Sequence, residues 1–285
     1  MKKWFMFILF IFFVYCISYF VSHLTKEKRD VPASGNIERI VSLTVAATQI
    51  LIELGLEDKI AGVNSTFSNP EEVKKKPHVG RQFGNINIEA VLSLKPDIVF
   101  ASNSDAEVLK EKDVNVFVVE TCNLNEVIRL VTEIGKVVAM ESQASQLVQK
   151  MQKRIDDIQE KLRKVNTRPL VYFESGAIGR TRAPGSLTHD LITMAGGINL
   201  AKDEPITFPL LSIERIIEMN PDIILLEEYG VPPEEVKKRD GWQKIKAVRN
   251  NKIFISPTMY TNYTPKCING LEQYARWFHP EAFGE

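Results

Sequence analysis

Residues 88–100 read IEAVLSLKPDIVF, and residues 213–225 read IERIIEMNPDIIL. The two stretches repeat at a constant offset of 125; five of their thirteen paired positions are identical, and five more exchange one apolar residue for another. Each copy predicts a short helix that stops at a proline, followed by a buried β-strand. Because one chain carries the unit twice, the repeat predicts two lobes of similar fold. Small ligands commonly bind in clefts between domains, so we expect a ligand site between these lobes.

Outside the repeats, apolar runs typical of strands alternate with helical patterns in both halves of the chain. This order predicts an α/β protein with two similar three-layer lobes, each built on a mostly parallel sheet. Between them, Glu141 to Val165 contains no glycine or proline, and its apolar residues recur in helical steps of three and four. Such a charged helix is either a surface or coiled-coil helix or a rigid strut between lobes. We expect an N-terminal lobe at residues 37–140, one long linking helix at 141–166 and a C-terminal lobe at 167–285.

The N-terminus carries an uncharged, strongly apolar run from Trp4 to Val21. These 18 residues are just long enough to span a bilayer, and they exceed the usual apolar region of a signal peptide. A retained membrane anchor, a cleaved signal and lipidation at Cys16 are the alternatives, although Tyr15 stands where lipoprotein signals usually carry a small residue. We expect a signal or anchor segment at residues 1–24, membrane contact through residues 4–21 and a polar tether at 25–36.

The composition and the motifs argue against two other classes of protein. Lys+Arg and Asp+Glu both total 36, so the chain lacks the basic excess that is usual in nucleic-acid-binding proteins. The sequence contains no G-x-S-x-G, no P-loop and no G-x-G-x-x-G after a strand. Ser186 is more simply a helix N-cap than a nucleophile served by His189. We therefore expect no enzyme and no cofactor. The alternative from another class is a membrane-tethered enzyme or protein-binding sensor built on two α/β lobes.

Histidine and cysteine are sparse in the body of the chain. His78, His189 and His279 form no clustered pattern, so we expect no bare metal-ion site. Cys122 and Cys267 could pair in an oxidising compartment, but the sequence has no C-x-x-C motif, and we expect two separate thiols.

Glu89 and Glu214 occupy matching positions in the two copies of the repeat, near the start of each predicted helix. The helix dipole favours a carboxylate there by roughly 0.3–1 kcal/mol, which explains each glutamate individually. As a pair, they place one exposed acid on each lobe. That arrangement also suits docking onto a two-fold symmetric partner with basic sockets.

The phrase NIEAVLSLKPDIV at 87–99 resembles the signature of the solute-binding proteins of ABC importers that carry cobalamin and iron complexes such as ferric siderophores. Three more segments resemble this family: residues 39–55, 191–199 and 269–281. Together they span nearly the whole body, residues 37–283. The resemblance implies two α/β lobes joined by one long helix with limited hinge motion, and a body outside the cytoplasm, in the periplasm or at the cell surface. It also implies that Glu89 and Glu214 form salt bridges with arginines of an ABC permease dimer.

Candidate ligand-binding residues lie in the loops after the predicted strands, because ligands of parallel α/β lobes bind at the carboxyl ends of strands. They are cationic or aromatic: Arg81, Phe83, Arg180, Arg182, Tyr229, Tyr260 and Tyr263. Arg180 and Arg182 could clamp an anionic iron chelate, with a solvated charged loop as the alternative. Phe83 falls near a position where corrinoid-binding relatives carry an aromatic residue. Tyr260 and Tyr263 could stack on a macrocycle or ligate iron, with ordinary half-buried tyrosines as the alternative.

These residues lead to one expectation about function. We expect an extracytoplasmic solute-binding protein of an ABC importer. It would capture an iron(III) chelate, a siderophore or haem, in the cleft between the lobes and deliver it to the permease. Cobalamin is the alternative ligand.

Overall fold

The computed structural model describes residues 37–66, 68–81 and 86–284, without the side chain of Arg81. The predicted signal or anchor segment at 1–24, the tether at 25–36 and the candidate Phe83 lie outside the described residues. Within the described ranges, no helix is both long and apolar enough to cross a membrane.

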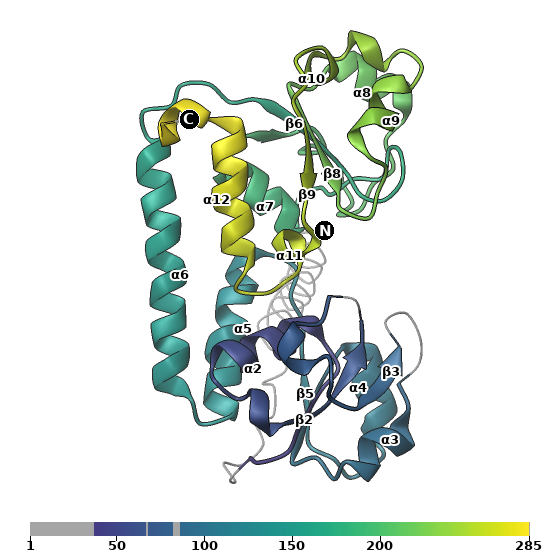
Figure 1. The fold of residues 1–285 in the computed structure, drawn as a ribbon, viewed down its shortest axis with the longest axis vertical. Helices are drawn as coiled ribbons and strands as arrows, with labels where there is room; N and C mark the ends of the chain where they lie inside the picture. Colours follow the sequence, from purple (N-terminus) through teal and green to yellow (C-terminus); the bar gives the residue numbers. More distant parts are fainter. Residues whose placement is uncertain (1–36, 67, 82–85, 285) are drawn as a thin grey trace, which may run out of the picture. The chain divides into compact units, whose positions relative to one another are not determined.

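The N-terminal lobe is built on a five-stranded sheet in which all paired strands are parallel, in the order β3-β2-β1-β4-β5 (Figure 1). The strands are β1 (Ile40–Ser42), β2 (Ile60–Ser65), β3 (His78–Arg81), β4 (Ile98–Ala101) and β5 (Val116–Val118). The connecting helices are α2 (Val45–Glu53), η1 (Glu57–Lys59), η2 (Glu71–Val73), α3 (Ile88–Ser93), α4 (Asn103–Leu109) and α5 (Leu124–Val137).

Alternate residues of the central strands of this sheet point into two separate cores. Ile40 and Phe100 join the apolar cluster formed with α2 and α5, whereas Val41 and Val99 join the cluster formed with α3 and α4. The sheet is therefore covered on both faces. This explains why its central strands read as continuous apolar runs rather than as alternating ones.

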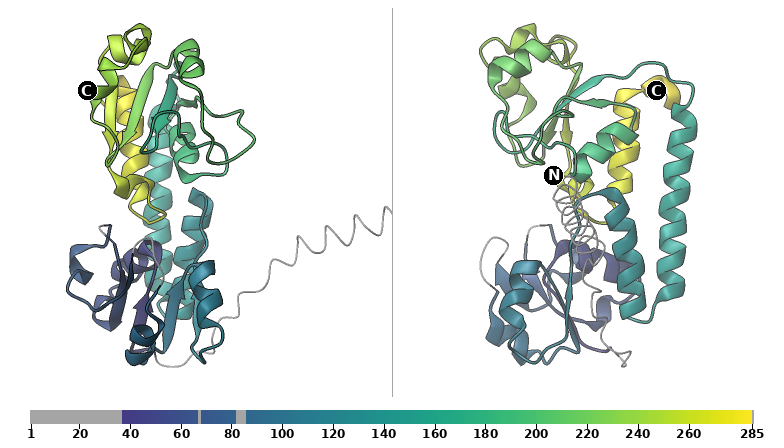
Figure 2. Two further views of the ribbon diagram at one scale, coloured as in Figure 1. Left: turned by 90° about the vertical axis from the view of Figure 1, so that its right-hand side faces the viewer. Right: turned by 180° about the vertical axis from the view of Figure 1, so that it is seen from behind.

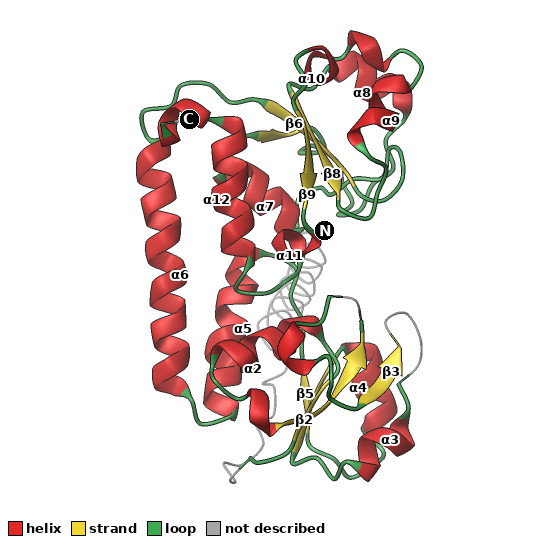
Figure 3. Ribbon diagram, viewed as in Figure 1, coloured by secondary structure: helices red, strands yellow, loops and turns green. Residues whose placement is uncertain are grey.

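The C-terminal lobe repeats this plan with a four-stranded sheet of parallel pairs in the order β7-β6-β8-β9 (Figure 3). The strands are β6 (Leu170–Glu174), β7 (Ile198–Asn199), β8 (Ile223–Glu227) and β9 (Ile253–Ser256). The helices are α7 (Leu187–Met194), α8 (Ile213–Met219), α9 (Pro233–Lys238), η3 (Trp242–Lys244), α10 (Lys246–Arg249), α11 (Thr258–Thr261), α12 (Cys267–Phe278) and η4 (Pro280–Phe283). The predicted α/β class with two similar lobes is confirmed, since two separate parallel sheets are present.

The linking helix is α6 (Glu141–Leu162), which ends a few residues before the predicted bound. It packs alongside α5 and α12, as two of the views show (Figure 2). Gly135 of α5 permits the close approach, because a Cβ there would stand 2.3 Å from the Cβ of Ala144 on α6. Arg154 of α6 also donates to Asn269 and to Glu272 of α12, each at 2.8 Å. One apolar cluster thus includes α6 and side chains from both sheets.

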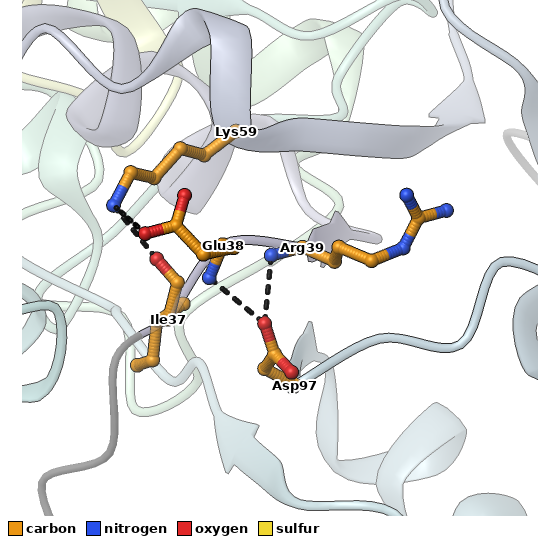
Figure 4. A network of polar contacts seen from close by, with 5 residues as sticks. All are labelled: Ile37, Glu38, Arg39, Lys59 and Asp97. Carbon is orange, nitrogen blue, oxygen red and sulfur yellow. Dashed lines mark hydrogen bonds and ion pairs between the residues drawn. The ribbon is translucent and has the colours of Figure 1, made fainter.

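The aspartate of each repeat makes equivalent hydrogen bonds in its own lobe. The backbone N–H of Asp97 donates to the carbonyl of Arg39 at 2.9 Å, and its carboxylate accepts from the backbone N–H groups of Glu38 and Arg39, each at 2.8 Å (Figure 4). Asp222 makes the matching pair of bonds with Leu170, at 2.8 and 2.9 Å. The Pro-Asp step therefore fastens the strand of each repeat to the start of the lobe's first strand.

Replacing Asp97 with alanine should lower the free energy of unfolding by about 1 kcal/mol at neutral pH, a small value because the site is exposed. The N–H groups of Glu38 and Arg39 lower the pKa of Asp97 below 3.8. A lowered folded-state pKa means that this stabilisation is present above the unfolded pKa and is lost as the pH falls through the folded value. Urea unfolding at neutral pH and near pH 3 should show the difference from wild type shrinking in acid. Asp58→Ala is the control, and an equal loss from it would contradict this role.

Candidate functional site

The loop after β6 pairs with the segment before α8 in a short antiparallel ribbon at the carboxyl end of the C-terminal sheet. Backbone hydrogen bonds join Thr181 to Pro209 at 3.0 Å, Ala183 to Thr207 at 2.8 Å and Leu211 to Gly179 at 2.8 Å. Gly179 has a φ of +79°, and a Cβ there would stand 2.2 Å from the carbonyl oxygen of Leu211. The segment after β6 is a loop, as the sequence predicted, and the structure adds its pairing with residues some thirty positions further along the chain. We call residues 179–183 with 207–211 the ribbon.

The two candidate arginines of the ribbon differ in their charge balance. Arg182 is half-buried, and its Nη2 lies 3.6 Å from Oε1 of Glu227, at the end of β8. Its guanidinium also lies 5.0 Å from the ring centroid of Phe208. Arg180 is exposed, and among the described residues its side chain has no hydrogen bond or ion pair. The structure therefore brings both arginines to one edge, but only the charge of Arg180 lacks a counterion there.

Large apolar side chains are exposed on the same loops. The exposed fractions are 60% for Ile206, 54% for Phe208 and 74% for Leu210, with Ile178 and the candidate Tyr229 nearby in the neighbouring loops at 39% and 63%. Sequence reasoning missed the first three. Their alternation with polar or small residues after Pro205 was the available signal, since it is typical of an extended segment with one apolar side. The C-terminal lobe thus presents apolar surface together with guanidinium groups at its strand ends.

Tyr260 and Tyr263 lie on or after α11, and both pack against the main core. Tyr260 rests on Gly270, where a Cβ would stand 2.6 Å from that of the tyrosine, and meets Tyr274 edge to ring at 6.4 Å. For Tyr260 this favours the interpretation as an ordinary half-buried tyrosine. Burial raises the pKa of Tyr263 by more than the nearby charge of Arg182 lowers it. Tyr263 therefore carries its proton at neutral pH and lies within electrostatic reach of the ribbon.

Two polar contacts are made by residues near the start of α7. The backbone N–H of Leu124, at the start of α5, donates to the carboxylate of Asp190 on α7 at 3.0 Å. Nδ1 of His189 lies 3.1 Å from the side-chain nitrogen of Asn199. Burial lowers the pKa of His189, so its ring is neutral and can accept this hydrogen bond. Both contacts involve the first turn of α7.

The N-terminal half of the candidate site is only partly described. Arg81 is the last residue of β3, and its side chain and Phe83 lie outside the described part of the structure. The structure therefore brings Arg180, Arg182, Tyr229 and Tyr263 to the loops of the C-terminal lobe and leaves the other lobe's candidates as predictions.

Glu89 and Glu214 each occupy the second position of their helix, as predicted. Asn87 caps α3 by accepting from the N–H of Ala90 at 3.0 Å, and Ser212 caps α8 by accepting from that of Arg215 at 3.2 Å. Both glutamates are exposed, and neither has an ion pair within the described part of the chain. They are therefore available to a partner.

Comparison with known proteins decides the family. The model of the periplasmic binding protein family matches residues 40–260, which is most of the chain. The chain belongs to the periplasmic binding protein family. As such a protein it is 33% identical over 272 residues, 91% of its own length and 85% of the relative's, to YvrC, an uncharacterised ABC transporter substrate-binding lipoprotein of Bacillus subtilis.

Two further similarities agree with this family. The binding protein is 26% identical over 247 residues to the vitamin B12-binding protein of Vibrio cholerae, with 83% of this chain and 87% of that one covered. A solved structure from Staphylococcus epidermidis, described as a possible iron-binding periplasmic solute-binding protein, aligns with a TM-score of 0.74 and 27% identity. That alignment covers 85% of this chain and 99% of the other.

From this family and these relatives, the chain is the substrate-binding component of an ABC importer and not an enzyme. Such a component acts outside the cytoplasm and interacts with a permease. The structure agrees with the simpler interpretation of Ser186, whose hydroxyl accepts from the N–H of His189 at 3.2 Å as the N-cap of α7. No disulfide bond joins Cys122 to Cys267, in agreement with the expectation of two separate thiols. Across residues 37–66, 68–81 and 86–284, no three His, Cys, Asp or Glu side chains are grouped to hold a metal ion.

Proposed function

We propose that this binding protein captures an iron(III) chelate, a siderophore or haem, between its lobes and delivers it to the permease. The observation that carries the proposal is the ribbon, where Arg180 has no counterion among the described residues and pairs with exposed Leu210, while exposed Phe208 lies against Arg182. A ligand with anionic groups and flat apolar faces complements such an edge, because guanidinium groups bind carboxylates and catecholate oxygens while apolar side chains cover the faces. Haem and aromatic iron chelates combine both features.

Cobalamin is the second candidate, and one observation favours it. The charge of Arg182 is balanced by Glu227 at 3.6 Å, so the ribbon offers less net positive charge than two adjacent arginines suggest. A large ligand rich in neutral amide groups would suit that balance. The similarity to the vitamin B12-binding protein of Vibrio cholerae is in keeping with this alternative.

The absorption spectrum of the full-length protein purified from its native host distinguishes these ligands, because haem, corrin and catecholate-iron differ in colour. Metal analysis of the same sample should find iron at about one atom per chain if a chelate is bound. A corrin spectrum with cobalt would replace the iron proposal by the second candidate. A colourless protein that gains no thermal stability from haemin, an iron(III) tris-catecholate or cyanocobalamin would contradict both.

We also propose how the protein is placed in the cell. The apolar segment at residues 4–21 would hold the body at the outer side of the membrane, with Glu89 and Glu214 facing the permease dimer. Similarity to a lipoprotein supports membrane tethering. Mass spectrometry of the membrane-bound protein separates an intact N-terminus from a cleaved one and from a lipid on Cys16. A mature protein found only in the released, soluble fraction would contradict the tether.

Replacing Arg180 and Arg182 together with alanine should weaken an anionic ligand at least about tenfold, or about 1.4 kcal/mol. We expect most of this loss from Arg180, because its charge has no counterion among the described residues, whereas the charge of Arg182 is already balanced by Glu227. Isothermal titration with haemin and with an iron(III) tris-catecholate measures the effect in each single variant and in the double variant. Lys202→Ala, in the same lobe, is the control for loss of one exposed positive charge. An unchanged dissociation constant would remove both arginines from the site.

A further inference from the structure

A buried chain of hydrogen bonds lies beneath the ribbon. Tyr172, in the middle of β6, is fully buried, and its hydroxyl lies 3.2 Å from Oε2 of Glu174. The same hydroxyl oxygen accepts a hydrogen bond from the backbone N–H of Gly179 at 3.0 Å. Glu174, whose side chain is only 2% exposed, accepts a hydrogen bond on each carboxylate oxygen from Nη1 and Nη2 of Arg239, both at 2.7 Å. Arg239 in turn lies 4.5 Å from the ring centroid of Trp242.

The chemistry of these groups allows only one donor-to-acceptor direction for this series of hydrogen bonds. A carboxylate can only accept hydrogen bonds, so the hydroxyl of Tyr172 donates to Glu174 and keeps its lone pairs for Gly179. The bidentate bond from Arg239 fixes the carboxylate, and each bond polarises the next in a buried chain of this kind. Burial also raises the pKa of Tyr172, so the phenol keeps the proton that it donates. The acceptor that Gly179 meets is therefore oriented before any ligand arrives.

Gly179 is the residue through which these buried hydrogen bonds reach the ribbon. Its N–H is held by Tyr172, and its carbonyl accepts from the N–H of Leu211 at 2.8 Å. Its neighbour Arg180 faces Leu210 across the ribbon, and the carbonyl of Arg180 accepts from the N–H of Ser175 at 2.9 Å. The position of one backbone amide thus sets where the exposed side chains of Arg180 and Leu210 stand.

We propose that Tyr172, held by the buried Glu174–Arg239 pair, is a positioning residue that fixes the ribbon and thereby sets the affinity of the C-terminal lobe for its ligand. No part of Tyr172 is exposed, so it acts on a ligand only through Gly179. The affinity part of this statement rests on the proposed function, whereas the part about the ribbon does not. Tyr172 is thus assigned a role that loop residues alone would not reveal.

Tyr172→Phe tests the proposal, because it removes one oxygen and keeps the ring packed edge to face at 6.1 Å from Trp242. The control is Asp222→Ala, which removes an acceptor for a backbone N–H at the opposite end of the same sheet. Amide hydrogen exchange of Gly179 and Leu211 in the full-length protein reports on the ribbon. Titration with haemin and an iron(III) tris-catecholate reports on affinity.

In Tyr172→Phe, we expect the amide of Gly179 to exchange at least about tenfold faster, and the dissociation constant to rise about tenfold. Asp222→Ala should lower the melting temperature and leave both readouts near wild type. Unchanged exchange at Gly179 would overturn the positioning role. Faster exchange with unchanged affinity would overturn the link to the ligand. If the wild-type protein binds neither probe, the proposed ligand class is wrong, and the exchange of Gly179 still decides whether Tyr172 holds the ribbon.

Discussion

Reversing the charge of both Glu89 and Glu214 to arginine should abolish uptake while leaving ligand affinity within about twofold of wild type. Each glutamate is exposed at the second position of its helix, one on each lobe, and would face a basic socket of the permease. An arginine in its place puts like charges together, which costs several kcal/mol at an interface. Two such contacts should lower uptake at least about a hundredfold, measured with a radiolabelled iron(III) chelate in cells that carry only the variant.

The matched control is a double reversal at Glu111 and Glu218, which are exposed glutamates of the same two lobes. It changes the net charge of each lobe by the same amount, so a general electrostatic effect would appear in both double variants. Removing an acid from the first turn of a helix costs only roughly 0.3–1 kcal/mol, so α3 and α8 should stay folded. Normal uptake by the Glu89/Glu214 variant, or equal loss in the control, would refute docking through these two residues.

The elements of the fold were largely predictable because their signals are local. Proline at 96 and 221 ends a helix before a buried strand in each lobe, and Ser186 caps a helix as its sequence position indicated. Short elements were missed, such as β3 and β7, whose few residues carry no clear period. The helices α9, α10 and α11 are also brief, and tertiary contacts rather than propensity decide such segments.

The candidate site was less predictable because its contacts join distant parts of the chain. The sequence indicated Arg180 and Arg182 as cations in a ligand loop, but it could not show that Glu227 balances one of them. Nor could it pair Glu174 with Arg239, which are 65 residues apart. Both pairings depend on tertiary contacts: Glu174 and Glu227 end the neighbouring strands β6 and β8, while their arginine partners come from other parts of the chain. Residue types therefore located the edge, whereas the charge of that edge required the structure.

Arg239→Met should produce the largest loss of stability of any single substitution considered for this protein, about 3–5 kcal/mol. Methionine keeps the length and apolar body of the side chain but removes the partner of Glu174, whose carboxylate is only 2% exposed. A buried carboxylate without its counterion pays a desolvation penalty that was offset in the wild type. The cation–π contact with Trp242, at 4.5 Å from the ring centroid, is lost as well.

The comparison that isolates burial is Arg163→Met, which breaks an exposed pair with Glu160 at 2.8 Å. Exposed pairs contribute about 0–1 kcal/mol, so this variant should unfold close to wild type in urea, a denaturant that leaves charges unscreened. The double variant Glu174→Leu with Arg239→Met should regain much of the loss, because no unpaired charge is then buried. If the double variant is as unstable as the single one, lost packing rather than the stranded carboxylate causes the effect. If Arg239→Met and Arg163→Met unfold alike, the buried pair does not hold this part of the lobe together.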